Sequence, residues 1–510
     1  MNSIRGKRSC IKNGLSVVLF VAVLAALPAR AQLAGANLSG VVMDASGRSV
    51  PNATISIKNV TTGVIREVQS NSDGLYSAPN LLPGDYDIEA SARSFSKTAV
   101  KGVTLTVGSE RALNLMLKVG AVNLVIQVTE LPPLVETSSS TLSATVERKT
   151  IVDLPLNGRD WTLLATLQPG VIAVRAQATT GNSANRGNRG FGNQLADSGH
   201  RPYENTYRVD GISINDYTNG APGSVLGVTL GVDAIREFNV VTTNYTAEYG
   251  RTSGAVINSV TKSGTNTFHG STYFFDRDKI FDARNFFDPA TKPPFRRIQF
   301  GASAGGPIIK DRTFIFGDYE GIRENQSLSF FDTVPSAAAR GGTLCSIPDP
   351  LRCSTNQVVV DQTIQAALAL WPLPNAGLRG NGDTGVFRTS GLKVSTENYF
   401  TVKVDHQLST RDSLNGTYFF DTAPQLIPDA LDNIINQVFA RRQMISLSET
   451  HAFGPSVVNV ARLGFNRSQG KVSQPFKAVN PAAAHTSLGT VAGQTSAYLL
   501  VTGITPAGGL

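Results

Sequence analysis

Residues 400–405 have the sequence Phe-Thr-Val-Lys-Val-Asp, and this stretch shows the alternation that recurs in the second half of the chain. Its polar side chains, Thr401, Lys403 and Asp405, alternate with apolar ones, so a strand here has one charged face and one apolar face. The run from Phe268 to Phe275 alternates with the same period. Transmembrane β-barrels show this pattern, with the polar face toward the lumen and the apolar face toward lipid. A soluble β-sandwich also alternates, so the pattern alone leaves both folds open.

The composition excludes several classes of protein before any motif is considered. The chain has 510 residues, enough for about three domains. Lys and Arg number 46 against 38 Asp and Glu, but five of the basic residues lie in the first 31 positions, and without them the net charge falls from +8 to +3. Charge therefore gives no support for a nucleic-acid partner. Three cysteines and five scattered histidines argue against a disulfide scaffold and a metal enzyme, so we expect no cofactor.

The first 31 residues have the features of a cleavable export signal. A basic head, Arg5-Gly-Lys-Arg8, precedes an apolar stretch from Leu15 to Leu27. That stretch spans about 20 Å as a helix, too short for a bilayer core of about 30 Å. We expect cleavage between Ala31 and Gln32 and export of the mature protein. No later segment is long and apolar enough for a membrane helix, so entry into a membrane requires a β-barrel.

Residues 37–118 predict a small β-sandwich. Ala53, Ile55 and Ile57 alternate with polar residues, and turn clusters such as Asn71–Gly74 recur every 8 to 12 residues or so. The order of the runs Gly40–Asp44, Val50–Ala53, Ser72–Tyr76 and Leu81–Tyr86 resembles the carboxypeptidase regulatory-like domain. No histidine occurs before His200, so the segment lacks the residues of a zinc hydrolase and is expected to be a spacer or docking module.

Residues 119–145 form a predicted linker that contains a short β-prone run, Leu124 to Thr129. One interpretation is a detached strand that pairs with the sheet of a partner protein. The other is the last strand of the sandwich, which runs on into the linker. The sequence does not separate these two interpretations.

From Val146 onward the pattern changes to that of an α/β segment. Trp161, Leu164 and Leu167 have helical spacing before Pro169-Gly170. The segment from Thr206 to Ile214 predicts a strand. Val232 to Phe238 predicts a short helix, and the following residues predict another strand.

Five runs in this segment carry a family resemblance. They are LPLNGR at 154–159, VDG at 209–211, AIREF at 234–238, YTAEYGR at 245–251 and GAVINSVTKSG at 254–264. Together they resemble the plug domain of TonB-dependent outer-membrane transporters, in the Oar-like branch that carries a regulatory-like domain in front. Later runs, such as Asn266–Ser271 and Phe314–Glu320, resemble the opening of the family's barrel.

The resemblance implies a mainly β protein with a small Ig-like or prealbumin-like sandwich and an α/β plug domain over residues 146–264. The N-terminal part of a transmembrane antiparallel β-barrel is expected over 265–510. In function it implies a receptor in the cell outer membrane, in contact with its lipid, that imports an external solute (a glycan, a siderophore or a peptide). A TonB-like energy-coupling protein would drive the import.

The resemblance also assigns roles to particular residues. The candidate contact for energy coupling is formed by Val125, Ile126, Gln127, Val128 and Thr129. The family's plug signature maps onto Asp210, Gly211, Tyr249, Gly250 and Gly254, which are expected to be structural positions.

Two other functions differ from transport. A surface adhesion or assembly scaffold of the outer membrane, without transport, is the alternative. A peptidase is rejected because the chain has no His/Glu or Ser/His/Asp grouping, and we expect no enzymatic activity.

Residues from Glu324 to about Thr396 are expected to form a long extracellular loop. Cys345 and Cys353 lie within it, and an exported protein favours a disulfide between them. Residues 364–371 have helical spacing, for which substrate contact and simple packing of the loop onto the barrel rim are both open.

The barrel region is short for the family. Its transporters close 22 strands around a plugged lumen. The residues after 264, at about 9–11 per strand with loops, hold about eight to ten strands. We therefore expect a truncated product of a longer gene that does not transport alone, because open strand edges are unfavourable in lipid.

Overall fold

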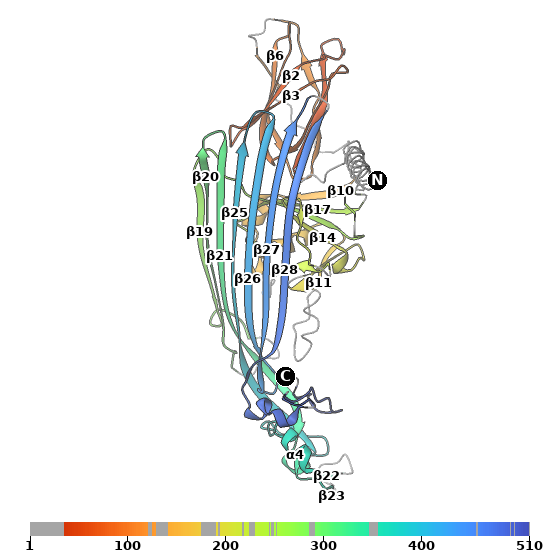
Figure 1. The fold of residues 1–510 in the computed structure, drawn as a ribbon, viewed down its shortest axis with the longest axis vertical. Coiled ribbons are helices and arrows are strands. Elements are labelled where there is room, and N and C mark those ends of the chain that lie inside the picture. The colour runs from red at the N-terminus through yellow and green to blue at the C-terminus, as the bar shows by residue number, and fades with distance from the viewer. Residues whose placement is uncertain are drawn as a thin grey trace, which may run out of the picture.

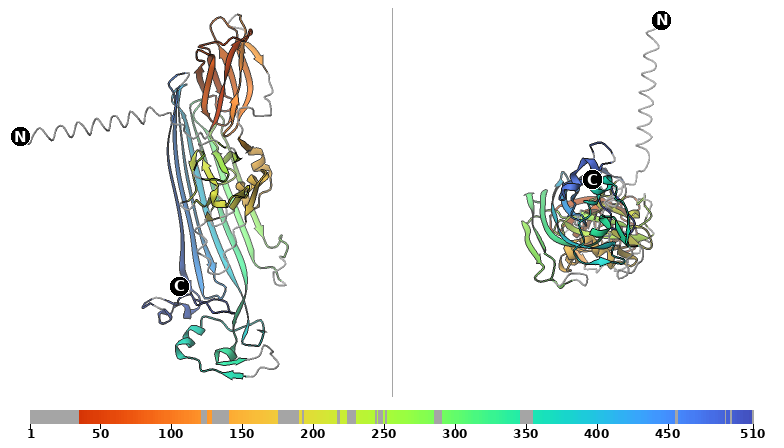
Figure 2. Two further views of the ribbon diagram at one scale, coloured as in Figure 1. Left: turned by 90° about the vertical axis from the view of Figure 1, so that its right-hand side faces the viewer. Right: turned by 90° about the horizontal axis from the view of Figure 1, so that it is seen from below.

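The computed structural model describes residues 35–120, 125–128, 141–174, 190–191, 194–216, 219–223, 230–243, 245, 249–250, 252–284, 291–345, 355–454, 457–489, 491–493 and 495–508. These residues form an elongated molecule (Figure 1). A small β-sandwich lies at one end, a long curved sheet runs along the molecule, and a compact domain packs against that sheet (Figure 2). Within the described residues, no helix is long and apolar enough to cross a membrane.

The sandwich consists of two sheets that enclose one apolar core. Its strands are β1 (Ala36–Asp44), β2 (Thr54–Asn59), β3 (Ile65–Gln69), β4 (Leu75–Leu81), β5 (Gly84–Ser91), β6 (Lys97–Leu105), β7 (Glu110–Ala112) and β8 (Leu115–Leu117). One sheet has the order β4-β1-β7, with β8 also paired to β1, and the other has the order β3-β2-β5-β6-β9, where β9 is Val125–Val128. Ile55 and Ile57 are fully buried while the residues between them are partly exposed, as the alternation predicts.

Strand β9 (Val125–Val128) is the edge strand of the second sheet and pairs in parallel with β6. Its register places Val125 opposite Lys97 and Val128 opposite Val100. The geometry thus agrees with the interpretation that this run is the last strand of the sandwich. Thr129, the fifth residue of the candidate coupling run, lies outside the described residues.

The compact domain that follows, called the plug domain here (142–261), is built around a five-stranded sheet of order β10-β17-β18-β14-β15. The strands are β10 (Leu142–Val146), β14 (Thr206–Val209), β15 (Ile212–Ser213), β17 (Ile235–Thr243) and β18 (Val256–Thr261). Helix α2 (Arg148–Asp153) and the 3₁₀ segments η1 (Asn157–Arg159), η2 (Trp161–Leu167) and η4 (Pro202–Glu204) surround it. Two small two-stranded sheets pair β11 (Val171–Val174) with β13 (Gln194–Asp197), and β12 (Gly190–Phe191) with β16 (Ala221–Pro222).

Three details of this domain differ from the prediction. The linker ends at Thr141 because β10 already pairs with β17 from Leu142 onward. The helical spacing at residues 161–167 gives a 3₁₀ segment. The short helix predicted over Val232–Phe238 is wrong: Ile235 begins β17, which is buried on both faces between β10 and β18 and therefore lacks the alternation that marks a half-buried strand.

The long curved sheet, called the barrel sheet here, is antiparallel throughout. Its strands are β19 (His269–Asp278), β20 (Phe295–Ile309), β21 (Thr313–Pro335), β24 (Leu378–Arg379), β25 (Thr384–Gln407), β26 (Asp412–Pro428), β27 (Ile434–Ala452) and β28 (Val458–Ala478). They follow one another in sequence order, with β24 paired to β25. The two hairpins predicted at residues 408–414 and around Gly454 are present, although Pro455 and Ser456 lie outside the described residues.

The alternation predicted for residues 400–405 is confirmed in the barrel sheet. Thr401, Lys403 and Asp405 are buried on its concave face, at 0%, 2% and 5% exposure, and the plug domain packs there. Val402 and Val404 on the convex face are 36% and 37% exposed. The concave face is therefore polar and covered, and the convex face is apolar and open, as a barrel requires.

The predicted loop over 324–396 is too wide at both ends. Strands β21 and β25 remain paired as far as Pro335 and Thr384, so the connection covers residues 336–383. It contains α3 (Ala337–Arg340), the small hairpin of β22 (Thr343–Cys345) and β23 (Thr355–Gln357), and α4 (Gln362–Leu368). Cys345 is disulfide-bonded. Its predicted partner, Cys353, lies outside the described residues.

The connection and the segment after β28 share a third apolar core at the end of the molecule far from the sandwich (Figure 1). That segment includes η5 (Pro481–Ala484) and η6 (Thr486–Leu488). Trp371, at the end of the predicted helical stretch, is buried in this core and donates from Nε1 to the Thr505 carbonyl at 2.6 Å. The loop therefore packs against the segment that follows β28.

Candidate functional site

The carboxylate of Asp210 is the central contact between the plug domain and the barrel sheet. Thr261 of the plug domain donates to it from its backbone N–H at 3.0 Å and from Oγ1 at 2.6 Å. From the barrel sheet, Thr417 donates from Oγ1 at 2.7 Å, and the Lys403 ammonium lies 3.6 Å away. Ser446 donates to the Asp210 carbonyl at 3.3 Å. One plug residue is thus fastened to three neighbouring strands, β25, β26 and β27.

The turn that presents Asp210 has a demanding backbone geometry. Asp210 and Gly211 are the two central residues between β14 and β15, and their φ angles are +47° and +82°. Two consecutive residues with positive φ are the mark of a type I′ hairpin, which asparagine, aspartate and glycine tolerate best. The Asp-Gly dipeptide of the Val-Asp-Gly run therefore has two roles. Both residues suit the turn, and the Asp210 carboxylate provides the charge that faces Lys403.

The same hairpin reaches β28, a fourth strand of the barrel sheet. A Cβ atom on Gly464 would lie 2.3 Å from Cδ1 of Ile212, so the absent side chain leaves room for the isoleucine. Asn466 donates from Nδ2 to the Asn215 carbonyl at 2.9 Å. The hairpin tip thus crosses β25 to β28.

A second polar contact joins the plug domain to the first strands of the barrel sheet. Asp233 accepts from Ser271 of β19 at 3.0 Å and pairs with Arg159 at 2.7 Å. Arg148 and Lys262 lie 3.5 and 3.6 Å from the same carboxylate. Asp233 is 7% exposed, and these three cations compensate its buried charge.

Arg159, the last residue of the LPLNGR run, also contacts the barrel wall directly. Its guanidinium carbon lies 4.1 Å from the ring centroid of Tyr273 and 5.1 Å from that of Phe275. Nε lies 4.0 Å from the Glu320 carboxylate on β21, which also accepts short hydrogen bonds from Tyr273 and Gln299. A planar cation between two rings and two carboxylates makes use of properties that lysine lacks.

The sandwich docks on the rim formed by the short turns of the barrel sheet. Asn266 donates from its backbone to the Thr61 carbonyl at 3.2 Å and from Nδ2 to the Thr62 carbonyl at 2.6 Å. Asn80 donates to Thr450 Oγ1 at 2.9 Å on the other side of the rim. A third contact joins the sandwich to the plug domain, because the backbone N–H of Val107 donates a short hydrogen bond to the buried Glu237 carboxylate.

A polar cavity of about 630 Å³ lies where the sandwich, the plug domain and the barrel sheet meet. Four basic side chains line it, those of Arg148, Lys149, Arg236 and Lys262, together with Glu147 and Glu237. A cavity of this size and polarity holds water, so the sandwich is not sealed against the plug domain by a dry apolar contact.

Comparison with known proteins gives family matches for the sandwich and for the barrel sheet. Residues 37–118 match the carboxypeptidase regulatory-like domain, and residues 260–509 match an outer membrane beta barrel domain. The TonB-dependent transporter Oar of Myxococcus xanthus is 27% identical over 307 residues, which cover 56% of this chain and 26% of Oar. The chain is a homologue of this TonB-dependent transporter. It is a protein of the outer membrane, and the predicted family, fold class and location are confirmed.

Two solved structures of outer-membrane proteins are also similar. The transporter YddB from Escherichia coli is 12% identical, with a TM-score of 0.42, and the match covers 64% of this chain and 38% of YddB. The ferric enterobactin receptor of Pseudomonas aeruginosa is 13% identical, with a TM-score of 0.38, and the match covers 64% of this chain and 41% of the receptor.

The chain spans about a quarter of the length of Oar. In outer-membrane barrels the short turns face the periplasm and the long connections face outward. The turns at residues 310–312 and 408–411 and the end of β27 at Ala452 lie at the sandwich end, and the described parts of the connection after Pro335 lie at the other. The sandwich is therefore on the periplasmic side.

The residues of the plug signature fall into two groups in the structure. Asp210 and Gly211 contact the barrel sheet, as described above. Tyr249 and Gly254 lie inside the plug domain: Arg208 stacks over the Tyr249 ring at 5.3 Å, and a Cβ on Gly254 would lie 2.5 Å from Oδ1 of Asn205. Gly250 is exposed. Ala31 and Gln32, the predicted cleavage site, lie outside the described residues.

Sequence reasoning missed several contact residues, chiefly Arg159, Asp233, Lys262, Glu320 and Thr417. Arg159, Lys262 and Glu320 stood within the quoted runs, but without a role. A usable signal existed for two of them, because Glu320 and Thr417 occupy the same strand face as the polar side chains that alternate with apolar ones.

Proposed function

We propose that the protein is an outer-membrane receptor and transporter that binds an external solute and imports it with energy from the inner membrane. The observation that carries this proposal is the plug domain on the concave face of the barrel sheet, fastened at Asp210 and Asp233. A domain in that position obstructs the lumen. Passage of a solute requires work on the plug domain, and a TonB-like protein on the periplasmic side supplies it.

The order of strands offers a route for that work. Strand β9 is the edge strand of the sandwich sheet, and β10, the next described strand along the chain, is the edge strand of the plug sheet. Tension on residues 125–129 therefore reaches β10 first. An edge strand separates from one neighbour only, so the five residues of β10 can leave β17 without breaking the centre of the sheet.

The test is deletion of residues 125–129 in the full-length protein, with deletion of residues 132–136 as a matched control of equal length in the same linker. Uptake of labelled glycans, siderophores and peptides is measured together with their binding to intact cells. The proposal expects the first deletion to abolish uptake while binding persists, and the control deletion to retain both. Uptake that survives the first deletion contradicts the coupling role, and binding without any coupled uptake supports the adhesion scaffold.

A cysteine pair tests the route itself. Ala144 of β10 lies opposite Val240 of β17, so Ala144→Cys combined with Val240→Cys can cross-link the two strands. We expect uptake to stop under oxidation and to return on reduction, while each single variant transports normally. Transport by the oxidised pair would show that β10 stays in place during import.

A further inference from the structure

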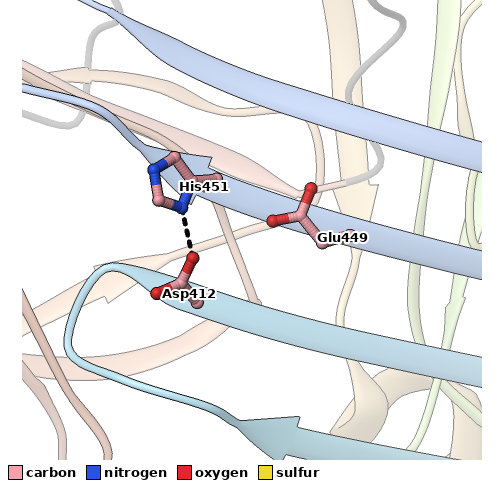
Figure 3. Close-up of side chains that lie close together, drawn as sticks. All are labelled: Asp412, Glu449 and His451. Atoms are coloured by element: carbon pink, nitrogen blue, oxygen red, sulfur yellow. Dashed lines mark hydrogen bonds and ion pairs between the residues drawn. The ribbon is translucent and has the colours of Figure 1, made fainter.

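Three side chains with metal-binding chemistry gather at the periplasmic end of β26 and β27, outside the plug contact. They belong to Asp412, Glu449 and His451 (Figure 3). Asp412, the first residue of β26, lies directly opposite His451 of β27. Glu449 precedes His451 by two residues on the same strand, so both side chains point to the same face. Strand register therefore brings the three together.

Their geometry is that of an incomplete coordination shell. One donor atom from each residue lies within 4.8 Å of the donor atoms of the other two. Nδ1 of His451 forms a short hydrogen bond with Oδ1 of Asp412. Ser409 donates a short hydrogen bond to the other Asp412 oxygen, which holds that carboxylate in place.

The three side chains lie on the convex face of the barrel sheet, at the sandwich end of β26 and β27. Thr450 and Ala452, which alternate with these residues along β27, are buried on the concave face. On the convex face, Glu449 is followed toward the strand centre by Leu447 and Ile445, at 43% and 45% exposure. His451 also packs edge-on against Phe453, with ring centroids 4.2 Å apart. The acids thus border the apolar surface that faces lipid.

The charge at this place is poorly compensated. Within the described part of the chain, no lysine or arginine forms an ion pair with Asp412 or Glu449. The basic groups that act on Asp412 are His451, which contacts it, and the neighbouring Arg411. Two carboxylates this close together repel each other, and a cation bound between them would relieve that repulsion. A divalent metal ion would do so and would also use the imidazole.

We infer that Asp412, Glu449 and His451 form a zinc-binding site on the periplasmic rim of the barrel sheet. One imidazole with two carboxylates suits zinc, whereas an all-oxygen set would suit calcium or magnesium. Zinc ligands lie about 2.0–2.2 Å from the metal, which places them about 3.4 Å apart in a tetrahedron. Side-chain rotations close the observed spacing to that value, and water takes the fourth position.

The bound metal fastens β26 to β27 beside the residues that hold the sandwich. Thr450 accepts from Asn80, and the Thr410 carbonyl accepts from the backbone N–H of Glu67. The site therefore stabilises the part of the rim on which the sandwich docks.

The test titrates zinc chloride into the untagged full chain in detergent, after treatment with a chelator, by calorimetry. We expect one zinc per chain. Glu449→Gln is the decisive variant, because it removes one ligand and leaves the hydrogen bond between Asp412 and His451 intact. It should weaken zinc binding by more than about tenfold. If Asp412 and His451 only form a hydrogen-bonded pair and Glu449 takes no part, Glu449→Gln binds zinc like the parent chain. In that case the inference fails.

Two further measurements control for misfolding and for zinc binding at other sites. His406→Asn removes a histidine at the same end of the barrel sheet that bonds to Thr313 at 2.8 Å, and it should bind zinc like the parent chain. Cobalt in place of zinc should give the visible absorption of a tetrahedral site in the parent chain, and His451→Asn should lose it. An octahedral cobalt spectrum, or zinc binding unchanged in both Glu449→Gln and His451→Asn, overturns the assignment.

Discussion

Thr417 of the barrel sheet donates from Oγ1 to the Asp210 carboxylate of the plug domain at 2.7 Å, although 207 residues separate the two in the chain. The Lys403 ammonium lies 3.6 Å from the other carboxylate oxygen and donates to the Thr261 carbonyl at 3.2 Å. The Lys403 side chain is 2% exposed. The contact is therefore a buried charge pair supplied with hydrogen bonds on both sides.

Asp210→Ala should destabilise the seating of the plug domain by about 3–5 kcal/mol, because it leaves the Lys403 ammonium buried without a counter-charge. The measurement is thermal unfolding of the chain in detergent, together with the rate at which protease cuts the plug domain. Lys403→Met in the same chain should restore part of the loss, since it removes the orphaned charge. Equal instability of the single and double variants would argue against this explanation.

Arg159→Lys should weaken the contact with β19 by about 1–2 kcal/mol, although it keeps the positive charge. The lysine ammonium has no planar group that could stack on Tyr273 while it pairs with Asp233. Arg148→Lys is the matched control, because Arg148 lies farther from Asp233, at 3.5 Å, and is more exposed. Proteolysis of the plug domain should rise clearly for the first variant and little for the second.

Asn266→Ala should loosen the sandwich from the rim by about 1–2 kcal/mol, because its side chain bonds both Thr62 and Asp311. Amide hydrogen exchange over residues 59–66 measures the change. Asn80→Ala, which removes a single hydrogen bond to Thr450, should have a smaller effect at the same residues. Exchange rates that do not move would show that other contacts hold the sandwich.

Glu237 should make the docking of the sandwich depend on pH. Burial raises the pKa of its carboxyl above the ordinary value, and the backbone hydrogen bond from Val107 only partly offsets this. A raised folded-state pKa means that the contribution of Glu237 is most favourable below the ordinary pKa and declines as the pH rises through the folded-state value. Glu237→Gln should therefore gain thermal stability over the parent chain as the pH rises from 4 to 8. The parent and variant curves should converge at the acid end.

The period-2 alternation made the strands of the barrel sheet predictable, because a strand with lipid on one side and a covered lumen on the other must separate its side chains by chemistry. The same reasoning failed at Val232–Phe238, where β17 has neighbours on both sides and burial on both faces. It also placed the ends of the outer loop within the paired strands, since the mixed polar and apolar residues from Asn325 to Pro335 are paired with β25.

The contacts of the candidate site were harder to foresee. Asp210 was singled out by its run, but the pairing with Lys403 and Thr417 depends on how a hairpin of the plug domain crosses strands β25 to β28, which lie some 200 residues later. Nothing local to either segment encodes that meeting. Likewise, Asp412 and His451 form a cluster because of strand register, which spacing along the chain does not reveal.

The hydrogen bond from Trp371 to Thr505 gives the outward tip of the molecule a small interior of its own, well away from the plug domain. Side chains on its surface, such as Val359 at 94% exposure and Leu500 at 76%, take no part in that interior. Sequence drift at these exposed positions therefore leaves that interior intact. The tip can therefore keep its fold while the residues on its surface change.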